Sequence, residues 1–259
     1  LKLRWIPQEL REDRGEIELA QTGKLPELVT ADHIRGDLHV HSNYSDGKRS
    51  IAEMAEAARA LGYSWILITD HSRSLRVAGG LDVAELRKQR REIERLNAKR
   101  RGFRVLTGTE VDILPDGSLD YPDEVLADLD VVVAAVHGRM DEPRNVQTDR
   151  IVRAMENPHV DVIAHPGGRR LGTREAMDLD WDRLLTVAAQ TGTALEVNGQ
   201  PDRLELTDVL VHEAVKRKVK LAIGTDAHGV AHLGFMRLAL AVARRGWARP
   251  EDVLNTLSA

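Results

Sequence analysis

Six of the ten histidines follow short runs rich in Val and Ile, the pattern of buried β-strands. These six are His39, His41, His71, His137, His165 and His228. Three carboxylates occupy similar places: Asp46 lies shortly after the first run, Glu110 ends the third, and Asp226 ends the seventh. In a parallel barrel the carboxyl ends of all strands form one rim, so we expect these nine side chains to meet there.

The spacing and the types of these residues predict a metal site. His39 and His41 alternate along one strand, as do Asp226 and His228, so each pair leaves one face of its strand. Imidazoles and carboxylates together suit zinc, manganese or iron. Nine ligands exceed the needs of one ion, so we expect two or three ions, with Glu110 as a bridge. The net positive charge of such a site would suit a phosphate group and would acidify bound water.

A buried set of this kind would be a costly core without metal ions. A single buried histidine, by contrast, is more often a structural residue. We therefore expect structural roles for the other four, which are His33, His159, His212 and His232.

The elements that must position the site alternate between apolar runs and helical patterns, which indicates an α/β chain with a parallel sheet. The predicted strands are Asp37–His41, Trp65–Asp70, Arg104–Glu110, Val131–His137, Asp161–His165, Ala194–Asn198 and Leu221–Asp226. Helices are predicted over Ile51–Leu61, from Asp82 onward, and over residues 145–156, 180–191, 206–217, 236–245 and 250–258. Seven such units predict a closed or nearly closed barrel. Residues 1–34 lack a long apolar run, so we expect an extended arm or linker before a single domain over residues 35–259.

Composition narrows the range of functions. The 259 residues include no cysteine, which excludes disulfides and thiolate metal sites. The net charge of −4 gives no global field for nucleic-acid binding. The longest uncharged stretches, such as residues 184–195, are too short to span a bilayer, and no signal peptide is visible. We expect a cytoplasmic protein without a membrane partner. Because the first residue is Leu1, we expect a piece of a longer chain.

The motifs of the predicted rim resemble those of the PHP family, the polymerase and histidinol phosphatase domains. The resemblance covers residues 35–259 and rests on Asp37-Leu38-His39-Val40-His41-Ser42, Ser45-Asp46-Gly47, Thr69-Asp70-His71-Ser72, Gly108-Thr109-Glu110, Val136-His137, Ala164-His165-Pro166 and Gly224-Thr225-Asp226-Ala227-His228. It implies the PHP fold, a distorted (β/α)₇ TIM-like barrel, with three divalent ions, Zn²⁺ or Mn²⁺ or both. All nine ligand positions are filled, so the resemblance implies an active member.

The resemblance also implies a distribution of the ligands. One ion would be held by His39, His41, Glu110 and Asp226. Glu110 would bridge to a second ion, held by His137 and His165. The third ion would be held by Asp46, His71 and His228. The residues expected to serve the reaction most directly are His39, His41, Glu110, His137 and Asp226.

The arm resembles a segment of bacterial family X DNA polymerases. Residues 5–18 and 25–29 are similar to the stretch that joins the polymerase part of those enzymes to their PHP domain. This implies a polymerase domain on the N-terminal side as a partner. It also implies a Mn²⁺-supported 3′–5′ exonuclease acting on DNA 3′ ends in DNA repair, with 3′-phosphatase and abasic-site endonuclease activity as further possibilities.

The expected reaction is hydrolysis of a phosphoester by a hydroxide held between two metal ions, with no Ser or Cys nucleophile. Rim arginines are expected to grip phosphates, with Arg73, Arg169 and Arg203 the main examples. Asn198 is expected to bind substrate or a metal-bound water. Asp37 and Asp70 are expected either to orient histidine ligands or to bond strand-end backbone.

Three other functions fit parts of the same pattern. A small-molecule phosphatase of the histidinol-phosphate type would use the same metals with a different substrate pocket. An amidohydrolase barrel also begins with His-x-His and ends with Asp, but it usually has eight strands and a Lys after the fourth. A docking module without activity would not need the complete ligand set.

Overall fold

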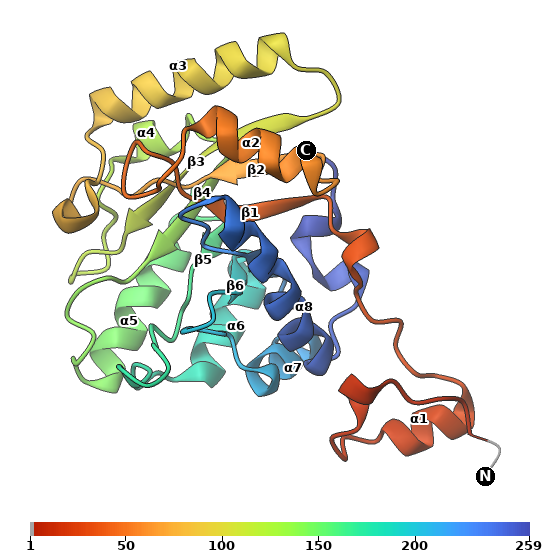
Figure 1. Ribbon diagram of the computed structural model, residues 1–259. Helices are drawn as coiled ribbons and strands as arrows, with labels where there is room; N and C mark the ends of the chain where they lie inside the picture. The colour runs from red at the N-terminus through yellow and green to blue at the C-terminus, as the bar shows by residue number, and fades with distance from the viewer. Residues whose placement is uncertain (1–2) are drawn as a thin grey trace.

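A computed structural model describes residues 3–259, and its centre is one sheet of seven parallel strands in sequence order (Figure 1). The strands are β1 Gly36–Val40, β2 Trp65–Ile68, β3 Arg104–Asp112, β4 Val131–Ala135, β5 Val162–Ile163, β6 Ala194–Asn198 and β7 Leu221–Gly224. The sheet nearly closes between its two edge strands, because Val40 at the end of β1 forms a parallel bridge with Ala227, which follows β7. The predicted seven-stranded barrel is thus confirmed.

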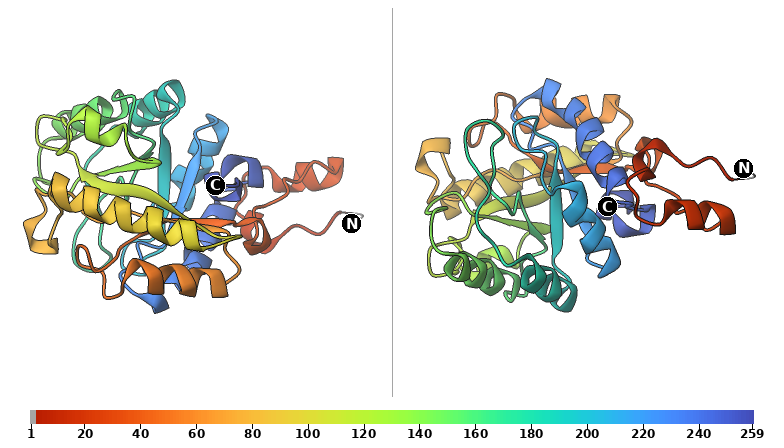
Figure 2. Two further views of the ribbon diagram at one scale, coloured as in Figure 1. Left: turned by 90° about the horizontal axis from the view of Figure 1, so that it is seen from above. Right: turned by 90° about the horizontal axis from the view of Figure 1, so that it is seen from below.

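Helices cover the outside of the strands (Figures 1 and 2). They are α2 Ile51–Ala60, α3 Val83–Lys99, α4 Asp123–Leu126, α5 Arg144–Met155, α6 Trp181–Thr191, α7 Asp208–Lys216 and α8 Met236–Arg245. α2 and α3 begin with capping boxes, in which Ser50 pairs with Glu53 and Asp82 with Glu85. Among residues 3–259, no helix has both the length and the apolar character needed to cross a membrane.

The strand faces that point into the barrel change from apolar to polar along their length. Leu106, Val133 and Ala222 belong to one buried apolar cluster. Four residues further along the chain come Glu110, within β3 and on the same face as Leu106, and His137 and Asp226, just after the ends of β4 and β7. The barrel thus carries an apolar filling toward one end and a polar rim at its carboxyl end.

The N-terminal arm, residues 3–34, is not simply extended, because it contains the helix α1 Glu16–Thr22 and two 3₁₀ turns. Leu10 and Leu28 pack against Trp247. Two ion pairs tie the arm to α8: Glu9 with Arg244 at 2.6 Å, and Glu12 with Arg245 at 2.7 Å. The charged stretch that suggested a linker therefore includes partners for α8. The arm (red) lies at the opposite end of the molecule from the loop after β2 (Figures 1 and 2).

The predicted helix over 250–258 is wrong. The segment forms two short 3₁₀ turns, η5 Pro250–Asp252 and η6 Leu254–Thr256. Asn255 explains the difference: its side chain is fully buried and bonds the backbone N–H and C=O of Ile223 and the carbonyl of Gly36. This tie across β1 and β7 requires a backbone path that a continuous helix would not supply.

Candidate metal centre

The nine predicted ligands come together at the carboxyl ends of the strands. They sit in β1 or directly after it (His39, His41), in the β1–α2 loop (Asp46), after β2 (His71), in β3 (Glu110), after β4 (His137), after β5 (His165) and after β7 (Asp226, His228). The ring of His41 lies 4.2 Å from that of His228, 4.5 Å from that of His71 and 5.1 Å from that of His39, measured between centroids.

Glu110 lies at the centre of this cluster. Its Oε2 is 3.3 Å from His39 Nε2 and 3.5 Å from His41 Nε2. Its Oε1 faces the other way, 2.7 Å from His165 Nε2 and 3.2 Å from His137 Nε2. His71 Nδ1 also lies 3.0 Å from Oε2. The two oxygens of Glu110 therefore face two separate sets of imidazoles, as the oxygens of a carboxylate that bridges two cations would.

The other two carboxylates flank His41 and His228. Asp226 Oδ1 is 3.3 Å from His41 Nε2 and 3.4 Å from His228 Nδ1. Asp46 Oδ1 is 3.2 Å from His228 Nε2 and 3.7 Å from His71 Nε2. Asp46 is more exposed than the rest of the cluster, so it forms the solvent side of the centre.

The ligand atoms form three groups, in each of which they lie within 4.8 Å of one another. The groups are His41, Asp46, His71 and His228; His39, His41 and Asp226; and His71, Glu110 and His137. They overlap more than the resemblance implied, because His41 and His71 each belong to two groups. His165 lies outside them and reaches the cluster through Glu110.

Buried nitrogens without partners show that these residues fit metal ions. Nε2 of His39, both ring nitrogens of His41, Nδ1 of His71 and Nδ1 of His165 have no hydrogen-bond partner within residues 3–259. Buried polar atoms are normally paired, since an unpaired one costs the lost hydration. Lone pairs aimed at divalent cations would remove that cost for the nitrogens that face the carboxylates.

The carboxylates and imidazoles also shift the pKa values of one another. Burial alone would raise the pKa of Glu110, but His71 and His39 hold it well below its usual range. Burial alone would lower the pKa of His39, but Glu196 and Glu110 raise it well above its usual range. His41 is the opposite case, because burial and the neighbouring His71 lower its pKa to about 3. In the absence of metal ions, positive charge on imidazoles such as His39 would balance the buried carboxylates, which is the role that cations take in a metal site.

Two supporting carboxylates are missing from the sequence-based prediction. Glu196 Oε1 lies 2.7 Å from Nδ1 of His39, and Asp112 Oδ1 lies 2.5 Å from Nδ1 of His137. Each leaves Nε2 of its histidine facing Glu110, the arrangement that orients metal-binding imidazoles. The signal for Asp112 was its position two residues after Glu110 on the same strand face, and the signal for Glu196 was a lone acid in an apolar strand.

Asp37 and Asp70 bond strand-end backbone and hydroxyl groups, not imidazole rings. Asp37 accepts from the backbone N–H of His39 and from both the N–H and the hydroxyl of Thr225. Asp70 accepts from the N–H and hydroxyl of Ser42. Of the two roles expected from the sequence, these contacts favour the second. Burial raises the pKa of each carboxyl to about 6.

Two of the ligand positions have unusual backbone. The φ angle is +28° at His165 and +51° at Asp226, in the left-handed region that favours glycine. Each residue lies two positions after the last residue of its strand, where the chain must direct the side chain into the cluster. Such angles persist only where the surroundings enforce them.

A cavity of about 270 Å³ opens onto the ligands, and Arg170, Arg174 and Arg203 line it. Arg203 is buried, and its Nε is 3.6 Å from Asp226 Oδ2. Its Nη1 has no hydrogen-bond partner in the part of the chain that the structure describes. Arg174 was not singled out in the sequence, since nothing in the loop after β5 distinguishes it from its neighbours.

The other predicted substrate residues do not line this cavity. Arg169 donates to the backbone carbonyls of Arg203 and Leu204. Arg73 pairs with Asp120 at 3.1 Å. Asn198 is buried and donates to Glu196 and Asp226. These positions favour a supporting role over the substrate contact expected from the sequence.

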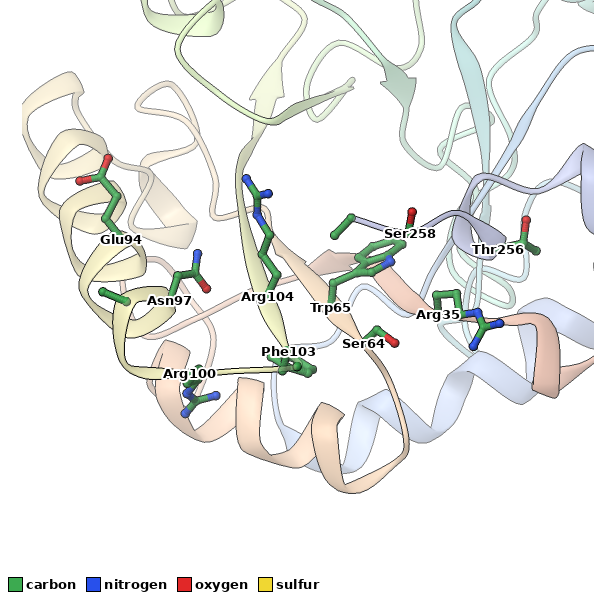
Figure 3. Close-up of a pocket in the computed structure, with 13 residues that line it drawn as sticks. Arg35, Ser64, Trp65, Glu94, Asn97, Arg100, Phe103, Arg104, Thr256 and Ser258 are labelled. Carbon is green, nitrogen blue, oxygen red and sulfur yellow. The ribbon is translucent and has the colours of Figure 1, made fainter.

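A larger cavity, of about 1020 Å³, lies near the amino-terminal ends of β1, β2 and β3 (Figure 3). Arg35, Trp65, Glu94 and Arg104 are among its lining residues, and Figure 3 shows them around the opening. No histidine and a single carboxylate line it, so it has no metal-ligand cluster. The cluster of nine ligand candidates, and not the larger cavity, is therefore the candidate active site.

Comparisons with known proteins agree with the geometry. The family model described as PHP domain matches residues 37–200. The chain is 46% identical over 253 residues to the DNA polymerase/3′-5′ exonuclease PolX of Bacillus subtilis (strain 168), which covers 98% of this chain and 44% of that protein. It thus spans less than half the length of that relative.

Two shorter proteins are also similar. A protein of Thermoanaerobacter sp. (strain X514) named "Probable phosphatase" is 30% identical, over 85% of this chain and 89% of its own length. The crystal structure of histidinol phosphate phosphatase from Lactococcus lactis, complexed with Zn, L-histidinol and phosphate, shares the fold with a TM-score of 0.61 at 17% identity, over 82% of this chain and 93% of that one. The chain belongs to the PHP domain family of metal-dependent phosphoesterases.

Proposed function

We propose that this protein hydrolyses phosphodiesters at DNA 3′ ends as a 3′–5′ exonuclease that depends on divalent metal ions. The observation that carries the proposal is the convergence of six imidazoles and three carboxylates beside a cavity lined by Arg170, Arg174 and Arg203. Similarity to the PolX relative over 98% of the chain supports DNA as the substrate. A polymerase domain is the proposed partner, because the chain spans only 44% of that relative.

In this proposal the nine ligands hold up to three divalent ions, with zinc and manganese the candidates. Such ions, when bound, polarise phosphoryl oxygens and lower the pKa of water. Glu110 spans the centre and fixes the separation of the two sides. Asp112 and Glu196 fix the rings of His137 and His39 so that Nε2 points inward.

Arg203 is proposed to hold a phosphate oxygen. Its Nη1 is buried beside the ligands without a hydrogen-bond partner in residues 3–259, and Glu205 Oε1 lies 3.8 Å from it. Arg169 donates to the backbone carbonyl of Arg203. An arginine in a site of low dielectric binds an anionic oxygen more strongly than one in water does. Asn198 is proposed to hold Asp226 and Glu196 in place.

A second candidate function is that of a small-molecule phosphatase. The cavity volume of about 270 Å³ is small for a ligand pocket, whose usual range starts near 300 Å³. The similarity to a probable phosphatase over 89% of its length points in the same direction. Both functions would use the same ligands and differ only in what lies beyond the phosphate.

The deciding experiment compares a 5′-labelled oligonucleotide with histidinol phosphate, each with Mn²⁺ and with Zn²⁺. The proposal expects stepwise shortening from the 3′ end and little release of phosphate from histidinol phosphate. His41→Ala should abolish the shortening, while Glu94→Gln, at the opposite end of the barrel, should leave it unchanged. Hydrolysis of histidinol phosphate alone would establish the second function, and shortening that persists in metal-depleted His41→Ala would contradict both. Oligonucleotides with a 3′-phosphate or an abasic site would test the two further activities.

A further inference from the structure

The cavity above the ligands has two unlike walls. Arg170, Arg174 and Arg203, from the loops after β5 and β6, form a cationic wall. Leu75, Val77 and Ala78, all from the loop after β2, form an apolar wall that we call the lip. In a seven-stranded barrel with its strands in sequence order, the loop after β2 lies across the mouth from those after β5 and β6. A ligand that fills the cavity therefore meets positive charge on one side and aliphatic carbon on the other.

Val77 is the most exposed part of the lip. It lies in the 3₁₀ turn η3 Arg76–Ala78, and 94% of its surface is exposed. Leu75 is half-buried and Ala78 is buried, so both support the turn from below. A single exposed valine is unremarkable on most surfaces, but here it stands at the mouth of the cavity that opens onto the ligands.

The lip is held in place by the same network that supports the ligands. The Ser74 N–H donates to Asp120 at 2.7 Å, and the Ser74 hydroxyl donates to Asp112, which also bonds His137. The Leu81 N–H donates to the carbonyl of His71 at 2.8 Å. The loop is thus bonded at one end to His71 and at the other to Asp112, which supports His137, so the turn that carries Val77 is anchored on both sides.

We propose that the lip packs against the deoxyribose and base of the terminal nucleotide while the cationic wall and the metal centre hold its phosphate. This inference rests on the proposed function and adds the part of the substrate that the metal centre does not touch. The volume of about 270 Å³ leaves no space for a strand of several nucleotides, so the rest of the strand must leave across the rim. No Phe, Tyr or Trp lines this cavity, so the base is held by shape and apolar contact. We therefore expect similar rates for the four 3′-terminal bases.

The test compares Val77→Ser and Val77→Asp on a 5′-labelled oligo(dT) and on glycerol 2-phosphate, a monoester that carries no base. Val77→Ser should raise KM for the oligonucleotide about three- to tenfold, as expected for the loss of an aliphatic side chain that the substrate covers only in part. Val77→Asp should raise it further, because a carboxylate at the mouth repels the phosphates. Metal content, kcat and hydrolysis of glycerol 2-phosphate should not change with Val77→Ser. Val209→Ser, at an exposed valine on α7, is the matched control.

The outcomes separate the lip from the proposed function. If the wild-type protein shortens the oligonucleotide and both Val77 variants keep its KM, the lip does not bind substrate. If Val77→Ser weakens both substrates equally, the residue supports the fold and not the nucleoside. If the wild-type protein cleaves glycerol 2-phosphate but not the oligonucleotide, the proposed function fails, and the nucleotide lip fails with it.

Discussion

The two ends of the barrel differ in a way that cavity size does not reveal. The amino-terminal end has the larger cavity, about 1020 Å³ against about 270 Å³ at the carboxyl end. Among its lining residues only Arg100, at Nη1, has a buried polar atom without a hydrogen-bond partner in residues 3–259. The Trp65 indole N–H donates to the Leu257 carbonyl at 3.0 Å, and Arg104 pairs with Asp130 at 3.2 Å. At the carboxyl end, imidazole nitrogens are buried without partners. Unpaired polar atoms, more than empty space, mark the end that is built for a ligand.

The largest expected effect comes from Asp226→Asn, which keeps the shape of the side chain but removes its charge. Hydrolysis should fall at least about a hundredfold, because a carboxylate that faces His41 and His228 is lost from the metal centre. The bound metal, measured by elemental analysis, should fall as well. Arg104→Ala, at the other end of the barrel, should keep activity within about twofold. Equal losses in the two variants would remove the distinction between the ends.

Removal of the metal ions should destabilise the carboxyl end. Ions that bind only the folded state, at about a hundred times their Kd, add roughly 3 kcal/mol, so chelation should lower Tm by about 5–10 °C. The fall in Tm should be much smaller in Asp226→Asn, because this variant already binds the metal ions more weakly. Arg104→Ala should respond to the chelator as the wild type does. An unchanged Tm after verified metal removal would show that the unpaired imidazoles do not destabilise the metal-free protein.

Two arginines, Arg203 at the carboxyl end of the barrel and Arg104 at the amino-terminal end, offer a more selective comparison. Arg203→Ala should raise KM for an oligonucleotide about tenfold, the loss expected for one charge-assisted hydrogen bond, with metal content nearly unchanged. Arg203→Lys should recover part of this loss, since it restores the charge but not the fork of the guanidinium. Arg104→Ala should have no effect on KM. An unchanged KM in Arg203→Ala would exclude this residue from phosphate binding.

The smallest expected effect concerns the dependence of stability on pH. Burial raises the pKa of Glu205 to about 7 from its ordinary value of 4.5, although Arg203 stands beside it. Between pH 4.5 and 7 the folded state therefore holds a proton that the unfolded state has lost, so this group makes stability fall as pH rises through that window. Glu205→Gln should add on the order of 1–2 kcal/mol at pH 8 and almost nothing at pH 4.

Urea unfolding of the metal-loaded protein at the two pH values would measure this difference. Glu94→Gln, which replaces a carboxylate lining the larger cavity, is the control and should show no such dependence. The same gain for Glu205→Gln at pH 4 and pH 8 would mean that Glu205 ionises normally.

The nine ligand candidates could be predicted from the sequence because strand ends and ligand spacing are local patterns. His39-x-His41 and Asp226-x-His228 needed only the two-residue period of a strand to be placed on one face. The partner of a ring nitrogen was not readable in this way. Glu196 bonds His39 across 157 positions of the chain, which depends on how β6 and β1 face each other across the barrel.

The arginines and the chain ends were predicted less well for a related reason. Arg169 and Arg203 occupy similar loop positions in the sequence, yet the first bonds backbone carbonyls and the second faces the ligands. Loop conformation decides between these roles, and no periodic pattern encodes it. The segment 250–258 has helical composition, but the buried contacts of Asn255 override that preference.

The left-handed backbone at His165 and Asp226 has a consequence for the evolution and engineering of this protein. Each angle costs a residue with a side chain some conformational energy that glycine would not incur. Glycine at either position would thus relieve the conformational strain but would remove a metal-ligand candidate. Variants selected only for heat resistance should therefore drift toward inactive proteins. A search for a hardier form of this domain must therefore select for turnover and thermal tolerance together.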